Sequence, residues 1–282
     1  MNGSVGGKEI RDTVDAIKGL AEAFPVYQDL LQPSVCEVGT TLHKTVKAAL
    51  VPIHAIVWSC ERVAGFIESK VTEKLAKVPP DRIITPSPLV AGPAIEALRF
   101  AGVDENLREM FATLLATSMD SRTAVAAHPC FVEIIKNLSP DEAKIIHLFA
   151  RDSEGLLPVI DLNAGSKKKS AHTAVLQDFS LIGHESGCER PDLAPTYLKN
   201  LERLGLVEIQ SKWIYDLTVY RPLEESNDLQ PFIQSIESTP GRNVQIVQKS
   251  VAVTNLGYDF CFACVWEHSE YKGRPITLEH DD

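Results

Sequence analysis

The chain has 282 residues, of which 44% are hydrophobic and 23% are charged, proportions that are ordinary for a soluble globular protein. Its formal net charge of −10 disfavours binding to nucleic acids or anionic membranes, because those partners are themselves negatively charged. The longest stretch without Asp, Glu, Lys or Arg in the helical region, Ala48 to Cys60, is shorter than the about 20 apolar residues that span a bilayer.

The N-terminal region contains no apolar signal-peptide core, and six cysteines are scattered along the chain. We therefore expect a cytoplasmic protein with reduced thiols. Residues 1–8 are rich in glycine and are expected to be disordered. The apolar spacing from Glu9 to Phe24 predicts a helix.

A long amphipathic pattern follows between Val38 and Val78, with apolar residues every three or four positions from Leu42 to Leu75. Pro52 should kink or split this helix. We expect the apolar stripe to pack against the following helices. A membrane-surface helix is the alternative, although its polar face mixes Glu with Lys and Arg instead of being basic.

Closely spaced prolines between Pro79 and Pro93 predict an extended, apolar strip that crosses the helical layer. Pro93 is expected to begin a short helix from Ala94 to Phe100.

The central stretch, Phe100 to Ala150, contains three helix starts in close succession. Asp104 is a good N-cap residue before a strong helical pattern of apolar residues. Pro129 opens a second helix. Ser139 to Glu142 predict a capping box, with a proline at the first helical position.

After Leu156 the pattern changes to short strands and helices. We predict a strand at 156–162, a polar loop at 166–170, a helix at 171–182 and a turn region at 183–192. Ala194 to Leu204 predict a helix that ends at Gly205. Further strands are predicted at 206–210, 213–220 and 244–253, with a polar insertion at 221–242 and a last helix capped by Thr254.

The order of these elements resembles a winged helix. We therefore predict a mainly α fold with a small β wing. It consists of a helical domain at residues 9–138, a winged-helix-like domain at 139–268 and a flexible tail at 269–282. The helix from Ser139 to Ala150 would then join the two halves.

In a winged helix, the helix from Ala194 to Leu204 would enter a DNA major groove. Its outward polar candidates are Lys199, Asn200 and Arg203, and Lys167, Lys168 and Lys169 could contact phosphates. These are few positive charges for a DNA-binding protein, which usually neutralises many phosphates. DNA binding is therefore an alternative to a role in protein contact.

Two further groups of residues could carry chemistry. Cys261, Cys264 and His268 share a helical face, and together with His184 and Cys188 they could supply four zinc ligands. The spacing matches no standard zinc finger, so buried core thiols are the favoured interpretation.

His128 could act as a base, with Asp120 or Glu133 as its partner. No nucleophile motif accompanies this histidine, so we predict no catalytic residue and no cofactor.

The central stretch also resembles a known protein family. The similarity rests on Pro86, Pro88, Gly92 and Pro93, on the helix from Leu107 to Ala116, on Met119 and Asp120, and on the segments 128–135 and 138–143. These residues resemble the abortive-infection alpha (Abi-alpha) family of bacterial phage-defence proteins. The resemblance implies a mostly helical cytoplasmic protein that acts in phage resistance, and it assigns no catalytic residue.

The resemblance leads us to expect a non-enzymatic antiphage component that acts through contact with a partner protein or with a second copy of itself. A phage component is a further candidate partner. A DNA-binding regulator and a membrane-acting effector that uses residues 42–75 are the alternatives.

Overall fold

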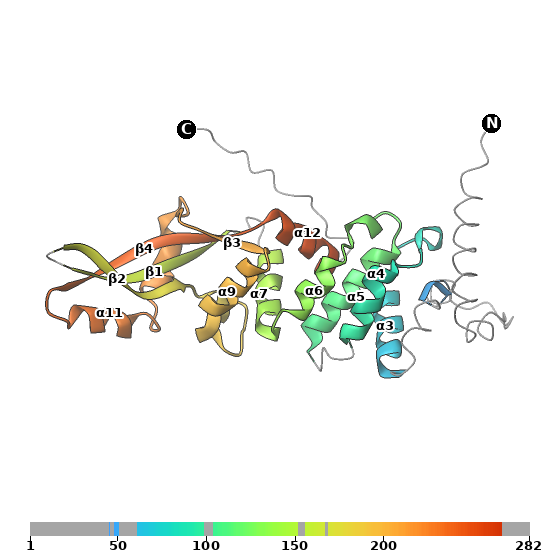
Figure 1. Ribbon diagram of the computed structural model, residues 1–282, viewed down its shortest axis with the longest axis horizontal. Coiled ribbons are helices and arrows are strands. Elements are labelled where there is room, and N and C mark those ends of the chain that lie inside the picture. The colour runs from blue at the N-terminus through green and yellow to red at the C-terminus, as the bar shows by residue number, and fades with distance from the viewer. Residues whose placement is uncertain are drawn as a thin grey trace, which may run out of the picture.

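The computed structural model describes residues 45, 48–50, 61–98, 104–151, 156–166 and 169–266. Within these ranges the protein is mainly α-helical and carries a four-stranded antiparallel sheet. Figure 1 shows an elongated molecule, with the helical layer at one end and the strands reaching towards the other. The expectations for residues 1–8, for the helix at 9–24 and for the tail at 269–282 lie outside the described residues.

The helical layer is organised around α5 (Glu105–Met119), in which every residue from Met110 to Met119 is buried. A helix that is buried on all sides must be covered by other parts of the chain. Among the described residues, four helices that precede the sheet contact it: α3 (Glu61–Lys74), α4 (Pro88–Leu98), α6 (Cys130–Lys136) and α7 (Pro140–Arg151).

The helix starts predicted at Asp104 and at Ser139 are confirmed. The carboxylate of Asp104 accepts a hydrogen bond from the N–H of Leu107 at 2.9 Å. At α7 the Ser139 N–H donates to Glu142 Oε2 at 2.6 Å, and the Glu142 N–H donates to Ser139 Oγ at 3.2 Å. This reciprocal pair is the capping box that the sequence predicts.

The amphipathic stripe is described only in part, from α3 onwards. Ile67, Val71 and Leu75 are buried in the core beside α5. This part of the stripe therefore packs against the following helices, as expected. Among the described residues, no helix combines the length and the hydrophobicity that crossing a membrane would require.

The prediction for the proline-rich strip was wrong at its end. A 3-10 turn, η2 (Pro80–Arg82), begins the strip, and Ile83 forms a bridge with Asp120. However, α4 begins at Pro88 and contains Pro93 within it. The carbonyl of Ser87 accepts from the N–H groups of Val90 and Ala91, so Pro88 takes the first helical position, where a missing N–H costs nothing.

The sheet has the strand order β2-β1-β4-β3. Its strands are β1 (Leu156–Ser166), β2 (Lys169–Phe179), β3 (Val207–Gln210) and β4 (Arg242–Val253). The predicted strands at 206–210 and 244–253 are confirmed, and β1 runs longer than predicted. Between β2 and β3 lie α8 (Ile182–Glu185), η4 (Pro191–Leu193) and α9 (Ala194–Arg203).

The helix predicted at 171–182 was wrong, because this segment is β2 and the start of α8. Leu162 pairs with Leu176 and Ile160 pairs with Phe179, so β2 contains one residue more than β1 between these pairs. Asp178 supplies the extra residue of this bulge, with φ of 57°. The bulge lets Leu176 and Phe179 pack into one core despite a spacing of three, which imitates a helical pattern.

The strand predicted at 213–220 was also wrong. Its second half is the 3-10 helix η5 (Leu217–Tyr220), where the Asp216 carboxylate accepts from the N–H of Thr218 at 3.0 Å. The predicted polar insertion at 221–242 contains α10 (Arg221–Glu224) and α11 (Gln230–Glu237). Apolar residues of both helices cover one face of the sheet.

The molecule contains two hydrophobic cores, which meet at β1. The first core runs from Leu50 to Cys264 and includes Val159 of β1, whereas Ile160 and Leu162 belong to the second core. Neighbouring residues of a strand face opposite sides, so the same strand contributes to both. Because the first core contains residues from both sides of position 138, the domain boundary placed there stays a prediction.

The last helix, α12 (Asn255–Cys264), returns the chain to the helical layer (Figure 1). The Thr117 hydroxyl donates to the carbonyl of Ala263 at 3.0 Å, and Trp266 Nε1 donates to the carbonyl of Ala150 at 2.8 Å. Its first turn touches the chain beside Gly205, since a Cβ at Gly257 would lie 2.1 Å from the Leu206 carbonyl oxygen. The chain thus leaves the helical layer after α7 to form the sheet, and returns after β4 through α12, which contacts α5 and α7.

Candidate functional site

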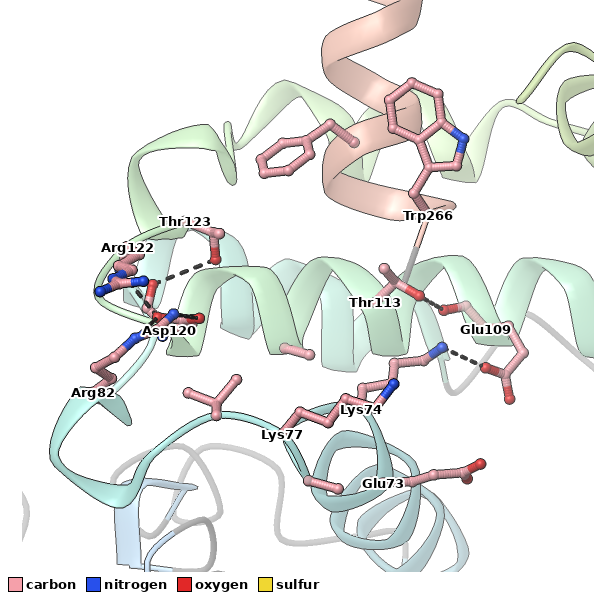
Figure 2. Close-up of a pocket in the computed structure, with 14 residues that line it drawn as sticks. Glu73, Lys74, Lys77, Arg82, Glu109, Thr113, Asp120, Arg122, Thr123 and Trp266 are labelled. Atoms are coloured by element: carbon pink, nitrogen blue, oxygen red, sulfur yellow. Dashed lines mark hydrogen bonds and ion pairs between the residues drawn. The ribbon is translucent and has the colours of Figure 1, made fainter. Parts of the chain in front are cut away.

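A pocket of about 470 Å³ lies in the helical layer, between the end of α3, η2, α5 and the end of α12 (Figure 2). Its charged lining residues are Glu73, Lys74, Lys77, Arg82, Glu109, Asp120 and Arg122. Its apolar lining includes Ala76, Val78, Ala116, Phe262 and Trp266. This is the size of a pocket that takes a small molecule, for which roughly 300–1,000 Å³ is usual.

Ion pairs fix both ends of the pocket. Lys74 Nζ lies 2.9 Å from Glu109 Oε2, and Lys70 Nζ lies 2.8 Å from Glu109 Oε1. At the other end the guanidinium of Arg82 binds the buried carboxylate of Asp120 through two N–H groups. Burial alone would raise the pKa of Glu109, but hydrogen bonds from Lys70 and Lys74 lower it.

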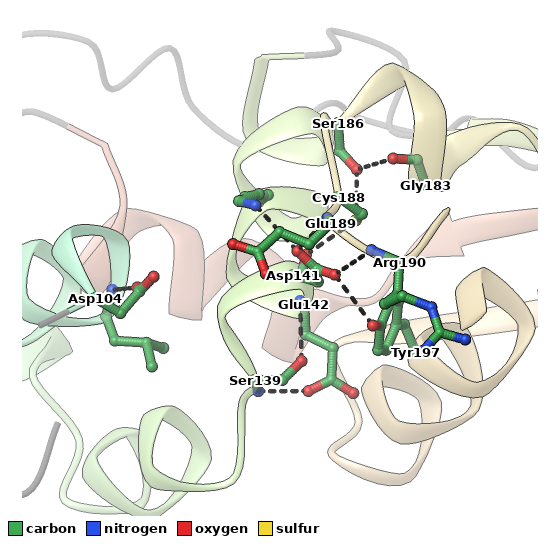
Figure 3. A network of polar contacts seen from close by, with 12 residues as sticks. Asp104, Ser139, Asp141, Glu142, Gly183, Ser186, Cys188, Glu189, Arg190 and Tyr197 are labelled. Atoms are coloured by element: carbon green, nitrogen blue, oxygen red, sulfur yellow. Dashed lines mark hydrogen bonds and ion pairs between the residues drawn. The ribbon is translucent and has the colours of Figure 1, made fainter. Parts of the chain in front are cut away.

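A second polar site lies where α7 meets the segment before α9 (Figure 3). The carboxylate of Asp141 accepts from the N–H groups of Glu189 and Arg190 at 2.9 and 3.1 Å, and from the Tyr197 hydroxyl at 3.1 Å. Lys144 Nζ lies 3.0 Å away. Desolvation would raise the pKa of Asp141, but these donors outweigh it and lower the pKa to about 2.

This Asp141 site attaches α7 to the segment before α9 and to α9 itself. Tyr197 has a pKa of about 12, raised first by burial and then by its hydrogen bond to Asp141. Both groups therefore keep one protonation state at neutral pH. Their contacts join α7 to the segment before α9 and to α9 itself, which is a structural role.

The residues predicted to read DNA lie on α9, but their polar atoms are bound within the protein. Lys199 Nζ lies 3.2 Å from Asp178 Oδ2 and 3.0 Å from Glu202 Oε2. The Asn200 amide donates to Glu142 Oε1 at 2.7 Å and to the carbonyl of Asn137 at 3.1 Å. These contacts hold α9 against β2 and α7.

Arg203 donates two hydrogen bonds to Asn200 Oδ1, at 3.0 and 2.7 Å. The structure thus brings Lys199, Asn200 and Arg203 together on one helix and surrounds them with acceptors of the same chain. Lys167 and Lys168 lie outside the described residues, and Lys169 begins β2.

The four candidate metal ligands that the structure describes form no metal-binding cluster. Cys261 and Cys264 are buried in α12, and burial raises the pKa of Cys261 to about 12, so its thiol is protonated. His184 pairs with Asp228 at 2.9 Å, and the Cys188 thiol contacts Ser186 Oγ at 3.2 Å. His268 lies outside the described residues. Within the described ranges, no three His, Cys, Asp or Glu side chains are placed to hold a metal ion.

His128 does not meet its predicted partners either. Its Nδ1 accepts from the N–H of Cys130 at 3.2 Å, at the start of α6. Asp120 binds Arg82, and Glu133 binds Lys136 at 2.9 Å. His128 therefore has a position typical of a residue that caps a helix.

Sequence reasoning missed an exposed aromatic loop, residues 211–216, between β3 and η5. Tyr215 is 98% exposed and Trp213 is 66% exposed, and Leu217 beside them is also exposed. Ile214, between the two aromatic residues, packs against the second core. The alternation predicts a strand, but it also marks one face that no described residue covers.

Hydrogen bonds hold the backbone of this aromatic loop at two points. Ser250 Oγ donates to the carbonyl of Lys212 at 2.8 Å, and the N–H of Ile214 donates to the Tyr220 hydroxyl at 2.8 Å. The Tyr220 hydroxyl in turn donates to the carbonyl of Lys249 at 2.7 Å. The loop is therefore anchored to β4, and its aromatic side chains are held outward.

The chain was compared with curated protein sequences and with solved structures. No protein among the curated sequences matches the chain at a significant level. One similar solved structure is that of an uncharacterized protein from the hydrocarbon-degrading marine bacterium Alcanivorax borkumensis. The two chains are 19% identical, 50% of this chain and 92% of that one are covered, and the TM-score is 0.33.

The family described as abortive infection alpha matches residues 61–264. The match extends from the first residue of α3 to the last residue of α12, and so includes both the helical layer and the sheet. Because it spans most of the chain, the protein belongs to the abortive infection alpha family.

Proposed function

We propose that this protein is an antiphage defence component that acts through protein contact in the cytoplasm, without catalysing a reaction. The observation that carries the proposal is membership of the abortive infection alpha family over residues 61–264. A defence component of this kind stops the spread of phage by halting or killing the infected cell.

The exposed aromatic loop supports a role in protein contact. Trp and Tyr are enriched among the residues that dominate binding energy at protein interfaces. Trp213 and Tyr215 are exposed while the backbone between them is anchored to buried groups. When a partner covers them, the loop loses little conformational entropy, because it is already ordered.

We also propose a winged-helix-like arrangement for residues 139–268. The pairing of β1 and β3 with β4, with α7 before β1 and α9 before β3, supports this arrangement, and β2 would be an added strand at the place of the helix predicted at 171–182. Such a domain would serve protein contact here, because Lys199, Asn200 and Arg203 are bound to acceptors of the same chain.

A phage challenge tests the proposed function. The gene is expressed alone, together with its genomic neighbours, or not at all, and plaque formation and survival of infected cells are counted. We expect fewer plaques when the protein and its neighbours are present. If no phage of a broad panel forms fewer plaques under any of these conditions, the proposed function is wrong.

A variant pair then tests the contact surface. Trp213→Ala with Tyr215→Ala should abolish protection without lowering thermal stability, since both side chains are exposed. Val125→Ala is the matched control, because Val125 is 93% exposed in the helical layer, and it should keep full protection. Full protection by the aromatic-loop variant would remove the loop from the proposal.

A further inference from the structure

We propose that the pocket between α3, η2, α5 and α12 binds a phosphomonoester of a small organic molecule. The proposal rests on the charge, the unpaired cations and the size of this pocket, and it is independent of the contact surface at residues 211–216.

The pocket carries a surplus of positive charge in an acidic protein. Four cations and three carboxylates line it, so the lining has a net charge of +1 in a chain whose net charge is −10. Each of the three carboxylates already has a cationic partner: Glu109 binds Lys74, Asp120 binds Arg82, and Glu73 lies 3.5 Å from Lys70, which is not part of the lining. A phosphomonoester carries about −1.5 to −2 at pH 7, which matches the two remaining cations of the lining better than a single carboxylate does.

Two of the pocket's cations are available for a ligand. Lys74 is bound to Glu109 and Arg82 is bound to Asp120, whereas Lys77 and Arg122 form no ion pair with any residue that the structure describes. Figure 2 shows Arg122 beside Arg82 at one end of the pocket and Lys77 next to Lys74. Charge-assisted hydrogen bonds from such groups are the usual means of binding phosphate.

The pocket is larger than a phosphate ion, so the ligand needs an organic part. Its volume is about 470 Å³, and Ala76, Phe262 and Trp266, which are at least partly exposed, supply apolar surface for that part. Arg82 is held in place by the buried Asp120, and Lys74 by Glu109. These two ion pairs fix the walls of the pocket, and Lys77 and Arg122 remain to contact the phosphate.

Isothermal titration of the full-length protein tests the proposal. The probes are AMP, glucose 6-phosphate, glycerol 3-phosphate and inorganic phosphate, with adenosine as the uncharged counterpart of AMP. We expect at least one phosphomonoester to bind more tightly than inorganic phosphate, and we expect AMP to bind at least about tenfold more tightly than adenosine. Lack of saturable binding by all four phosphates would overturn the proposal.

Charge-reversal variants locate the site. Lys77→Glu and Arg122→Glu should each weaken phosphomonoester binding by about tenfold or more. Both side chains are exposed, so the fold should persist, and a thermal melt verifies this. Lys212→Glu makes the same charge change in the distant aromatic loop and should leave affinity unchanged. If all three variants weaken binding equally, or if none of them weakens it, the phosphomonoester binds elsewhere.

Discussion

The two cores of this protein are built in different ways. The first core is large and is organised around α5, whose residues from Met110 to Met119 are all buried. The second core is small, with six buried residues between β1 and the helices η5, α10 and α11. Polar contacts supplement it, such as the Tyr220 hydroxyl that bridges the aromatic loop and β4.

The two cores therefore have different roles in stability and in function. The first core contains most of the buried apolar surface and so should determine global stability. The second core holds an exposed loop in position, a task that needs local order more than a large core. The family match covers both, so neither is an accessory of the other.

The largest expected effect is a loss of stability when one buried side chain is truncated in each core. Phe111→Ala should lower the free energy of unfolding by about 3–5 kcal/mol, because it removes an aromatic side chain from a site that cannot collapse. Leu223→Ala should cost about 2–3 kcal/mol, at the low end for such a change, since the small second core can relax around the gap. Urea denaturation measures both values.

Hydrogen exchange distinguishes the two variants further. Leu223→Ala should accelerate exchange mainly in residues 211–247, whereas Phe111→Ala should accelerate it throughout the described helices and strands. Faster exchange of α5 in the Leu223 variant would contradict the division into two cores.

The next effect concerns the joint at Asp141, whose pKa is about 2 in the folded protein instead of 3.8. A lowered pKa stabilises the fold by about 2 kcal/mol above pH 4, and this contribution is lost as the pH falls from about 4 to about 2. Asp141→Asn should therefore destabilise the protein by about that amount at pH 7 and should weaken the acid dependence. Denaturant midpoints measured between pH 2 and pH 7 check both statements.

The control for this experiment is Glu133→Gln, which removes an exposed carboxylate of α6. Its effect should stay within about 0.5 kcal/mol, as is usual for surface substitutions. An Asp141→Asn variant whose stability follows the same acid profile as the wild type would show that other carboxylates cause the pH dependence.

The smallest effects compare a local cap with one that spans the fold. Ser139→Ala should cost about 1 kcal/mol, since it removes only the cap of α7. Thr254→Ala should cost up to about 2 kcal/mol, because Thr254 Oγ1 caps α12 and also donates to the carbonyl of Gly205 at 2.5 Å. Thermal unfolding of the two variants gives the comparison, and an equal loss would mean that the Gly205 contact contributes nothing.

The sequence by itself determined three helix starts, those of α5, α7 and α12. Asp104, Ser139 and Thr254 act on N–H groups only three residues away, so their role depends on local sequence alone. The same local logic placed the end of α9 at Gly205, which adopts φ of 76°. It also applies to Ser87 and Pro88, where the start of α4 went unrecognised among the neighbouring prolines.

The candidate sites depended on contacts that the sequence does not reveal. Lys199, Asn200 and Arg203 were placed on the correct helix, but their partners lie on β2, on α7 and beside them on α9. The pocket combines residues of α3, η2, α5 and α12, which are far apart in the chain. No spacing rule connects such residues, so only the folded structure brings them together.

Only the tertiary structure decided that residues 169–179 form a strand. Their helix-like spacing is the product of the bulge at Asp178, and the strand exists because β1 supplies its hydrogen-bond partners. The exposure of Trp213 and Tyr215 was decided in the same way, by the packing of Ile214 and the hydroxyl of Tyr220. A helix forms its hydrogen bonds within its own segment, whereas a strand or a loop must find them elsewhere in the chain.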